Sequence, residues 1–182
     1  MQLRDQTQRG FSLLEVMVAL VVLTVGLLGV LKLETLAYAS TNVAAKRSLA
    51  ALEAASLAAS MHVNRGYWAT PDTSAAAISL TGTVITVGAG AAPLLSAQIG
   101  TAQACRSLTV PCQPPQMAAY DLQQWALTMK PLLPNYAATI NCGTANPVSC
   151  MINIQWNENA VALNNQETGA LASPSYTLYV EP

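Results

Sequence analysis

The stretch that decides the fold is FSLLEVMVALVVLTVGLLGVL, residues 11–31. It holds 21 residues and a single charged side chain, that of Glu15. At about 1.5 Å per residue, a helix of this length spans about 30 Å, the thickness of the hydrocarbon core of a bilayer. The stretch therefore predicts a transmembrane helix.

Glu15 is the one residue in this stretch that the membrane disfavours. A carboxylate inside a lipid-facing helix costs roughly 2.5–3.5 kcal/mol on insertion scales. A nearby cation or the positive end of the helix dipole would offset that cost. Both would be present if the mature chain began at Phe11, because its free amine would lie one helical turn from Glu15. Gly10 directly precedes Phe11 and ends a short polar segment, MQLRDQTQRG, whose two arginines favour the cytoplasm.

The sequence at this junction, RG-FSLLEVMVAL, resembles the processing site of a type IV prepilin. The shared features are a short basic leader ending in Gly, an aromatic first mature residue and Glu as the fifth, and the resemblance covers residues 9–31. It implies that prepilin peptidase, a membrane aspartyl peptidase, cleaves between Gly10 and Phe11. It also implies that Phe11 is N-methylated and that Glu15 pairs with the amine of a neighbouring subunit in a filament.

Three other interpretations of residues 11–31 compete with the prepilin. An uncut membrane anchor is one. A secretory signal is another, because Ala37-Tyr38-Ala39 before Ser40 fits a small-x-small cleavage site, although the hydrophobic run exceeds the usual length of about 7–15 residues. A buried core helix fits worst, because the rest of the chain is too small to surround it.

The helix is expected to continue beyond the apolar run. Residues 32–64 contain no Pro or Gly and are rich in Ala and Leu, which favour helix. We predict one helix from about residue 12 to residue 64, stopped at Gly66, with its second half amphipathic and packed on a globular domain. The expected organisation is a leader at 1–10, a hydrophobic helix at 11–31, its amphipathic continuation at 32–65 and a periplasmic or extracellular domain at 66–182.

Composition limits the functions open to the distal part. Hydrophobic residues make up 52% of the chain and charged residues only 9%, with a formal net charge of −1, so no basic surface indicates a nucleic-acid partner. All four cysteines follow the helix, and an even number there predicts disulfides in an oxidising compartment. Three pairings are possible; we expect the sequence-local one, Cys105–Cys112 with Cys142–Cys150. The wide spacings and the single His argue against a metal site, and no cofactor is expected.

The distal part predicts a small antiparallel sheet. The β-branched segment 78–87 is expected to form a strand or hairpin, and residues 137–142 and 151–156 a pair of strands around a turn closed by two cysteines. In the second of these, Ile152, Ile154 and Trp156 should face the core. Residues 176–180 form the last predicted strand. The expected fold is α+β and pilin-like, with the last three strands forming a half-buried sheet on the long helix.

One short helix is expected between the two disulfide-closed segments. Asp121 is a natural N-cap, Trp125 lies on the apolar face and Pro131 should end the helix after Lys130. The segment before it, residues 105–115, is expected to be a loop closed by a disulfide.

The order of motifs in the distal half adds a second resemblance. A cysteine pair, then YDLQQW at 120–125, LLP at 132–134 and a cysteine-bounded hairpin leading into INIQW at 152–156 are similar to minor pilins of the PilV type. This resemblance implies a minor pilin that takes part in type IV pilus assembly, as a priming or tip subunit, with other pilins as partners. Before assembly it would span the inner membrane once with its amino terminus in the cytoplasm; afterwards it would lie in a pilus at the cell surface.

Three alternatives remain open. A surface adhesin that binds a host or matrix ligand would be compatible with pilin assembly, but no aromatic cluster or charge patch in the distal part names its ligand. A pseudopilin of a type II secretion system would share the leader and the helix. A membrane-anchored periplasmic binding domain or enzyme belongs to another class, and the chain offers it no GxSxG, no HExxH and no evident carboxylate pair for acid–base work. We therefore expect no catalytic activity.

Overall fold

The computed structural model describes residues 10–70, 77–88, 95, 98–99, 105, 111–158 and 173–182. The chain divides into two compact units, Met1–Asn42 and Val43–Pro182. The helix α1 (Leu13–Val63) runs without a break from the first unit into the second, as the lack of Pro and Gly in residues 32–64 predicted.

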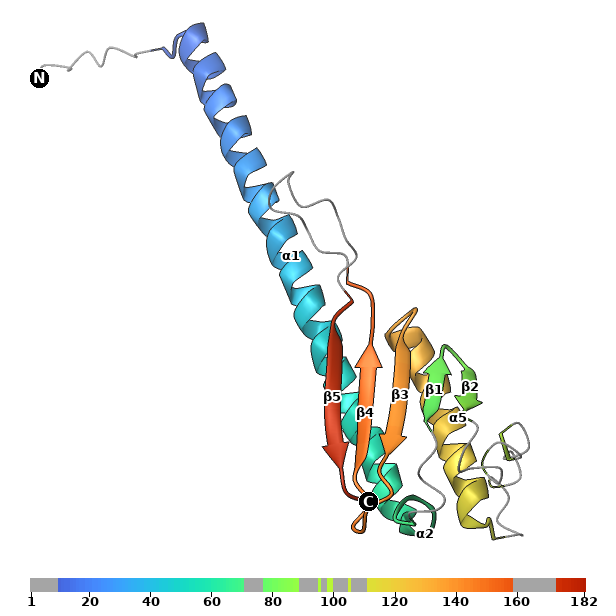
Figure 1. The fold of residues 1–182 in the computed structure, drawn as a ribbon. Helices are drawn as coiled ribbons and strands as arrows, with labels where there is room; N and C mark the ends of the chain where they lie inside the picture. Colours follow the sequence, from blue (N-terminus) through green and yellow to red (C-terminus); the bar gives the residue numbers. More distant parts are fainter. Residues whose placement is uncertain are drawn as a thin grey trace, which may run out of the picture. The chain divides into compact units, whose positions relative to one another are not determined.

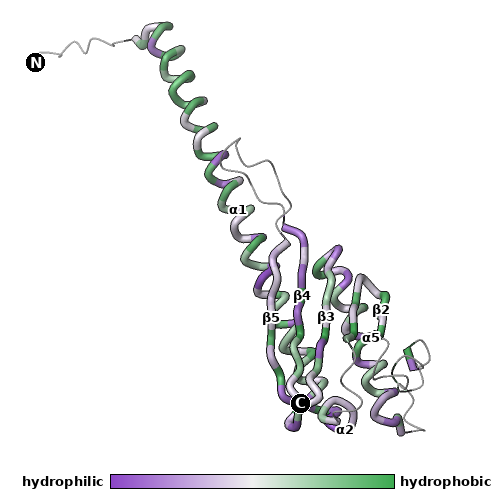
Figure 2. Tube along the Cα trace, viewed as in Figure 1, coloured by the Kyte–Doolittle hydropathy of each residue, from purple (hydrophilic) through white to green (hydrophobic). Residues whose placement is uncertain are grey.

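In the first unit, the described part of α1 is apolar and open to its surroundings. Every side chain from Leu13 to Thr35 is exposed, and Figure 2 shows the same segment as strongly hydrophobic. Large side chains such as Leu14 and Leu28 are 74% and 66% exposed. An apolar surface of this extent is stable in lipid or against other apolar helices, but not in water.

The second unit contains a five-stranded antiparallel sheet with the strand order β2-β1-β3-β4-β5 (Figure 1). The three strands predicted near the C-terminus are all present. The segment 78–87 forms a hairpin, and its first strand pairs with β3, so two more strands join the predicted sheet. The bounds are β1 Ile78–Thr81, β2 Val84–Val87, β3 Ala137–Cys142, β4 Cys150–Gln155 and β5 Ser175–Val180.

One face of this sheet is covered by helices. The second part of α1 and the helix α5 (Pro114–Leu132) lie behind the strands in Figure 1. Strand residues alternate between this covered face and the opposite one, and Ile152, Ile154 and Trp156 are buried as predicted. Many of the buried residues of α1 and α5 are small, which allows close packing: Ala50, Ala54, Ala58, Ala118, Ala119 and Ala126.

A chain of contacts through Trp125 and Tyr136 ties the layers together. The indole Nε1 of Trp125, on α5, donates to the backbone oxygen of Glu53, on α1, at 2.9 Å. The Trp125 ring meets that of Tyr136 edge-on, with centroids 5.8 Å apart. The Tyr136 hydroxyl in turn donates to the carbonyl of Gly82 in the β1–β2 turn, at 2.6 Å. Trp125 is thus a core residue, as predicted, and Gly82 supports the tight two-residue turn with a φ of +59°.

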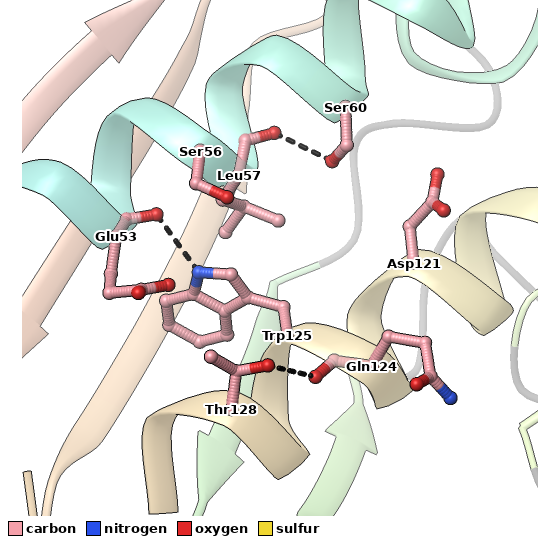
Figure 3. Close-up of a pocket in the computed structure, with 8 residues that line it drawn as sticks. All are labelled: Glu53, Ser56, Leu57, Ser60, Asp121, Gln124, Trp125 and Thr128. Carbon is pink, nitrogen blue, oxygen red and sulfur yellow. Dashed lines mark hydrogen bonds between the residues drawn. The ribbon is translucent and has the colours of Figure 1, made fainter. Parts of the chain in front are cut away.

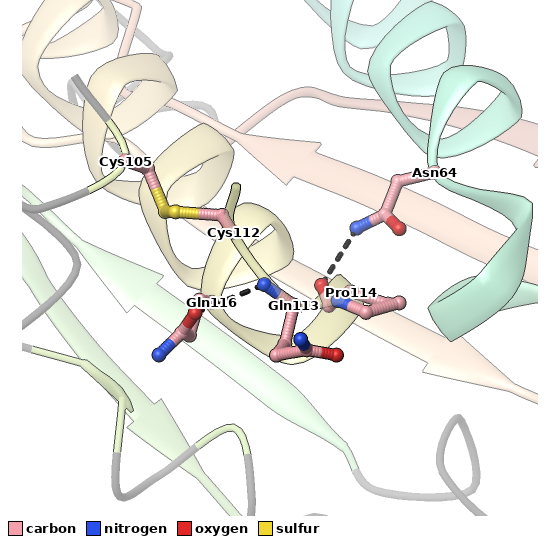
Figure 4. The surroundings of a disulfide bond; sticks show 6 residues. All are labelled: Asn64, Cys105, Cys112, Gln113, Pro114 and Gln116. Carbon is pink, nitrogen blue, oxygen red and sulfur yellow. Dashed lines mark hydrogen bonds between the residues drawn. A yellow bond between two sulfur atoms is a disulfide. The ribbon is translucent and has the colours of Figure 1, made fainter. Parts of the chain in front are cut away.

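The predicted limits of the short helix were wrong at both ends. The helix α5 begins at Pro114, seven residues before Asp121, and Pro131 lies inside its last turn. Pro114 and Pro115 fit its first turn because proline has no N–H to leave unpaired there. Gln113 is the N-cap, and its backbone N–H donates to the Gln116 side chain at 2.9 Å (Figure 4). The expected loop at 105–115 therefore ends as the start of a helix.

Gly66 was also assigned wrongly as the point where the long helix stops. α1 ends at Val63, and Gly66 lies within a following single turn, α2 (Arg65–Trp68). A Cβ added to Gly66 would lie 3.3 Å from the Cγ of Pro114, so the glycine permits a close approach between α2 and α5. Asn64 fixes the same junction, because its side-chain amide donates to the Pro114 carbonyl at 2.8 Å (Figure 4).

Two predictions fall partly outside the described residues. They concern the leader at residues 1–10, of which Gly10 is described, and the disulfide-closed loop at residues 105–115, of which residues 106–110 are not described.

Candidate functional site

The beginning of α1 presents the residues that the sequence placed at a processing site. Gly10 and Phe11 precede the helix, and Phe11 is 82% exposed. The helix starts at Leu13, which leaves Ser12 in the N-cap position. The backbone N–H of Glu15 donates to the Ser12 hydroxyl at 3.2 Å and to the Ser12 carbonyl at 3.0 Å.

Ser12 is a functional detail that the sequence reasoning missed. The signal was present, because Ser12-x-x-Glu15 has the spacing of a capping box. This cap fixes the first turn of the helix, so Glu15 stands in that turn, where the helix dipole favours a negative charge.

Glu15 is the only charged residue between Phe11 and Leu31, and its neighbours on the helix are exposed apolar side chains. Within the described residues its carboxylate has neither an ion pair nor a hydrogen bond. A charge on such a surface requires a partner once the surface is covered, and the described part of this chain supplies none.

α1 is also the one helix among the described residues that is long and apolar enough to cross a membrane. Its most apolar window of 18 residues has a mean hydropathy of 2.6, and none of that window is buried. The length, apolar character and exposure of this segment match what a helix needs in a lipid environment.

Two disulfides stabilise the second unit. Cys105 bonds to Cys112, directly before α5 (Figure 4), and Cys142 bonds to Cys150. Cys142 and Cys150 face each other in the register of β3 and β4, so their bond closes the end of that hairpin. All four cysteines of the chain are thus paired, and no group of three or more potential metal ligands occurs among the described residues.

A polar cleft of about 250 Å³ lies between α1 and α5 (Figure 3). Glu53 and Asp121 contribute carboxylates, and burial raises the pKa of both above the ordinary values. Figure 3 shows the two carboxylates on opposite sides of Trp125, not directed at each other. The remaining lining residues are hydroxyl-bearing, amide or apolar: Ser56, Leu57, Ser60, Gln124 and Thr128.

This cleft lacks the arrangement that acid–base or nucleophilic catalysis needs. Ser60 and Thr128 donate to backbone carbonyls of their own helices, at 2.8 and 3.1 Å, and neither contacts a base. The hypothesis of a catalytic domain therefore gains no support from this cleft.

A buried charge near the C-terminal strands was not foreseen from the sequence. Glu158 is only 4% exposed and accepts hydrogen bonds from Arg47, at 3.3 and 3.2 Å, and from the indole of Trp156, at 2.9 Å. Burial alone would raise the pKa of Glu158, but these bonds and the nearby charges of Arg47 and Lys46 outweigh it and hold the pKa below its ordinary value. No sequence pattern links residues 47 and 158.

The comparison with protein families addresses the N-terminal segment. The family model described as the prokaryotic N-terminal methylation motif matches residues 5–31. The match supports a type IV pilin-like protein made as a prepilin. Neither a curated protein nor a solved structure matches the chain.

The architecture agrees with this pilin-like assignment. A long apolar N-terminal helix packs its second part on an antiparallel sheet, and two disulfides close loops in the same unit. The motif family is structural rather than catalytic, and the motif implies processing by prepilin peptidase and assembly with other pilins. The motif and the apolar helix together fit a membrane-anchored pilin.

Proposed function

We propose that this pilin-like protein is a minor pilin that takes part in type IV pilus assembly as a priming or tip subunit. The leader, residues 1–10, is cleaved between Gly10 and Phe11 at the inner membrane, and the new amine of Phe11 is methylated. Residues 11–31 then leave the bilayer and enter a bundle of similar helices. The domain at residues 66–182 lies in the periplasm and later at the cell surface, and residues 32–65 connect the two.

The observation that carries this proposal is the single carboxylate of Glu15 in the otherwise apolar segment at residues 11–31. Each subunit brings one anion near the start of α1 and, after cleavage, one cation at Phe11. Because an unpaired charge is costly among apolar helices, the pairing of Glu15 with the amine of a neighbour sets the axial position of one subunit against the next. Small residues such as Gly26 and Gly29, with open space around their Cα atoms, permit close helix packing.

A pseudopilin of a type II secretion system would use the same leader and helix. The loose similarity of the distal motifs to minor pilins of the PilV type favours the pilus. The partners that copurify with the protein from its native cells distinguish the two systems. Pilus subunits support the proposal, whereas secretion-system subunits overturn it in favour of the pseudopilin.

Processing is tested by mass spectrometry of the protein from native cells. The expected result is a chain that begins with methylated Phe11. A mature chain that begins at Met1 identifies an uncut anchor, and one that begins at Ser40 identifies a secretory signal; either result overturns the proposal.

Assembly is tested with Glu15→Ala, with Glu34→Ala as the matched control on an exposed site of the same helix. We expect both variants to be cleaved, but only Glu34→Ala to copurify with the other pilins. Normal incorporation of Glu15→Ala would rule out the proposed pairing.

A further inference from the structure

The face of the sheet that points away from α1 and α5 is here called the outer face (Figure 1). Its side chains are exposed or half-buried, and no described helix covers them. The strand alternation and register assign thirteen residues to it: Ser79, Thr81, Val84, Thr86, Ala137, Thr139, Asn141, Met151, Asn153, Gln155, Ser175, Thr177 and Tyr179.

A row of hydroxyl and amide side chains crosses all five strands of this face. Each member pairs with the next in the strand register, so five neighbouring strands each contribute one polar group to the same line. Neighbouring strands lie about 4.8 Å apart, which gives the row a regular spacing. From β2 to β5, the row consists of Thr86, Ser79, Thr139, Asn153 and Thr177.

The groups in this row both donate and accept hydrogen bonds. The Asn153 amide donates to the Thr177 hydroxyl oxygen at 2.8 Å. That bond orients both side chains and leaves the Thr177 hydroxyl proton and the Asn153 carbonyl oxygen available to a ligand. Beside the row, Tyr179 is 71% exposed and lies opposite Met151 in the register, so an aromatic ring borders the polar line.

None of the thirteen residues assigned to the outer face is charged. None of the five strands contains Asp, Glu, Lys, Arg or His. Edge strands commonly carry charged side chains that block further pairing, yet β2 and β5, the two edges of this sheet, have none. A polyanion or polycation would find no counter-charge here, whereas a neutral ligand would lose no ionic hydration on binding.

We propose that the outer face binds a neutral, hydroxyl-rich polysaccharide. Sugar hydroxyls donate and accept hydrogen bonds as the row does, and the apolar face of a sugar ring can stack on Tyr179. Antibody paratopes likewise combine rigid aromatic side chains with adaptable Ser and Asn groups. The neutrality of the face selects against acidic glycans and nucleic acids. This inference does not depend on filament assembly, because the face belongs to one subunit.

The test uses the full chain in mild detergent, run on native gels that contain dextran or yeast mannan as neutral probes, or hyaluronan or heparin as acidic ones. We expect a neutral probe to retard the protein, with little effect of added salt because no ion pairs form. Tyr179→Ala should weaken retardation by about tenfold, as loss of an aromatic anchor does.

A matched pair of lysine substitutions locates the binding surface. Thr177→Lys places a charged side chain at an exposed position in the row, and Ala55→Lys adds the same charge at an exposed position on α1. We expect Thr177→Lys alone to abolish retardation, while both variants retain the thermal transition of the parent by circular dichroism.

Three results would overturn the inference. They are the absence of retardation by both neutral probes, salt-sensitive retardation by heparin or hyaluronan alone, and equal effects of the two lysine variants. A Tyr179→Cys variant that cross-links to a second copy in the absence of glycan would assign the face to subunit contacts instead.

Discussion

Arg47 on α1 holds the carboxylate of Glu158, a residue 111 positions later in the chain, through two hydrogen bonds. The guanidinium side chain is 62% exposed, whereas the carboxylate side chain is 5% exposed, so the anion is the buried partner. Trp156 supplies a third hydrogen bond to the same carboxylate. These contacts fix the beginning of the segment that follows β4 against the long helix.

The lowered pKa of Glu158 predicts a loss of stability in acid. Because this pKa is depressed in the folded state, the stabilisation is complete above its ordinary value of 4.5 and is lost as the pH falls through the lower folded value. We expect the difference in unfolding free energy between the parent and Glu158→Gln to shrink as the pH falls below about 4.5. Urea denaturation from about pH 3 to pH 7 measures this difference, and a constant difference would contradict the assignment.

The indole of Trp156 makes its own contribution to this site. Trp156→Phe keeps an aromatic ring but removes the donor to Glu158, and we expect a loss of about 1.5–3 kcal/mol, as for other hydrogen bonds to a buried charge. The same urea titration at neutral pH provides the measurement. No change in stability would show that water replaces the indole without cost.

For the carboxylates of Glu53 and Asp121 in the cleft, we expect stability to depend on pH in the opposite direction. Burial raises the pKa values of Asp121 and Glu53, so the folded chain binds protons more tightly than the unfolded chain, and stability falls as the pH rises through the folded values. Asp121→Asn and Glu53→Gln should therefore raise the melting temperature at neutral pH and leave it nearly unchanged in acid. Glu181→Gln, at an exposed position, is the matched control. Destabilisation at neutral pH would show that these charges have partners in the folded protein.

Removal of the Tyr136 hydroxyl group should lower the free energy of unfolding by a measurable amount. Its side chain is fully buried, burial raises the pKa of its phenol to about 12, and the hydroxyl donates to the Gly82 carbonyl. Tyr136→Phe leaves that carbonyl without this donor and should cost about 1 kcal/mol in urea unfolding. Tyr179→Phe, on the exposed face, should cost almost nothing. Equal effects of the two substitutions would contradict the role of the bond.

The bond between Cys142 and Cys150 should stabilise the β3–β4 hairpin through the entropy of the unfolded chain. A loop with a sequence separation of 8 gains about 2.5 kcal/mol in the chain-entropy model. We expect Cys142→Ala/Cys150→Ala to lose about this amount in urea unfolding and to become cleavable by protease within residues 143–149. Cys105→Ala/Cys112→Ala, which opens a loop of similar length, is the control and should leave residues 143–149 resistant. Unchanged protease resistance in the first variant would show that strand pairing alone closes the hairpin.

Local sequence patterns predicted the structure correctly where it depends on residues that are close together in the chain. The uninterrupted Ala- and Leu-rich run predicted α1 to within a residue at each end, and alternation predicted which side chains of β4 face the core. They failed at α5, where an Asp that resembles an N-cap lies inside the helix and the true start depends on Gln113, Gln116 and two prolines. Gly66 was wrongly interpreted as a helix stop. Its lack of a side chain instead makes room for Pro114, a residue distant in sequence.

The sequence by itself determined the apolar segment with its one carboxylate and the presence of strands, and it predicts the cleavage junction at Gly10 and Phe11, because each of these depends on composition and on spacings of a few residues. Only the tertiary structure decided that the 78–87 hairpin joins the sheet beside β3, that Arg47 meets Glu158, and that five polar residues form one row across the outer face. Those relationships join residues up to 111 positions apart. They follow from how whole helices and strands pack their apolar faces against one another. Local sequence patterns do not predict this packing.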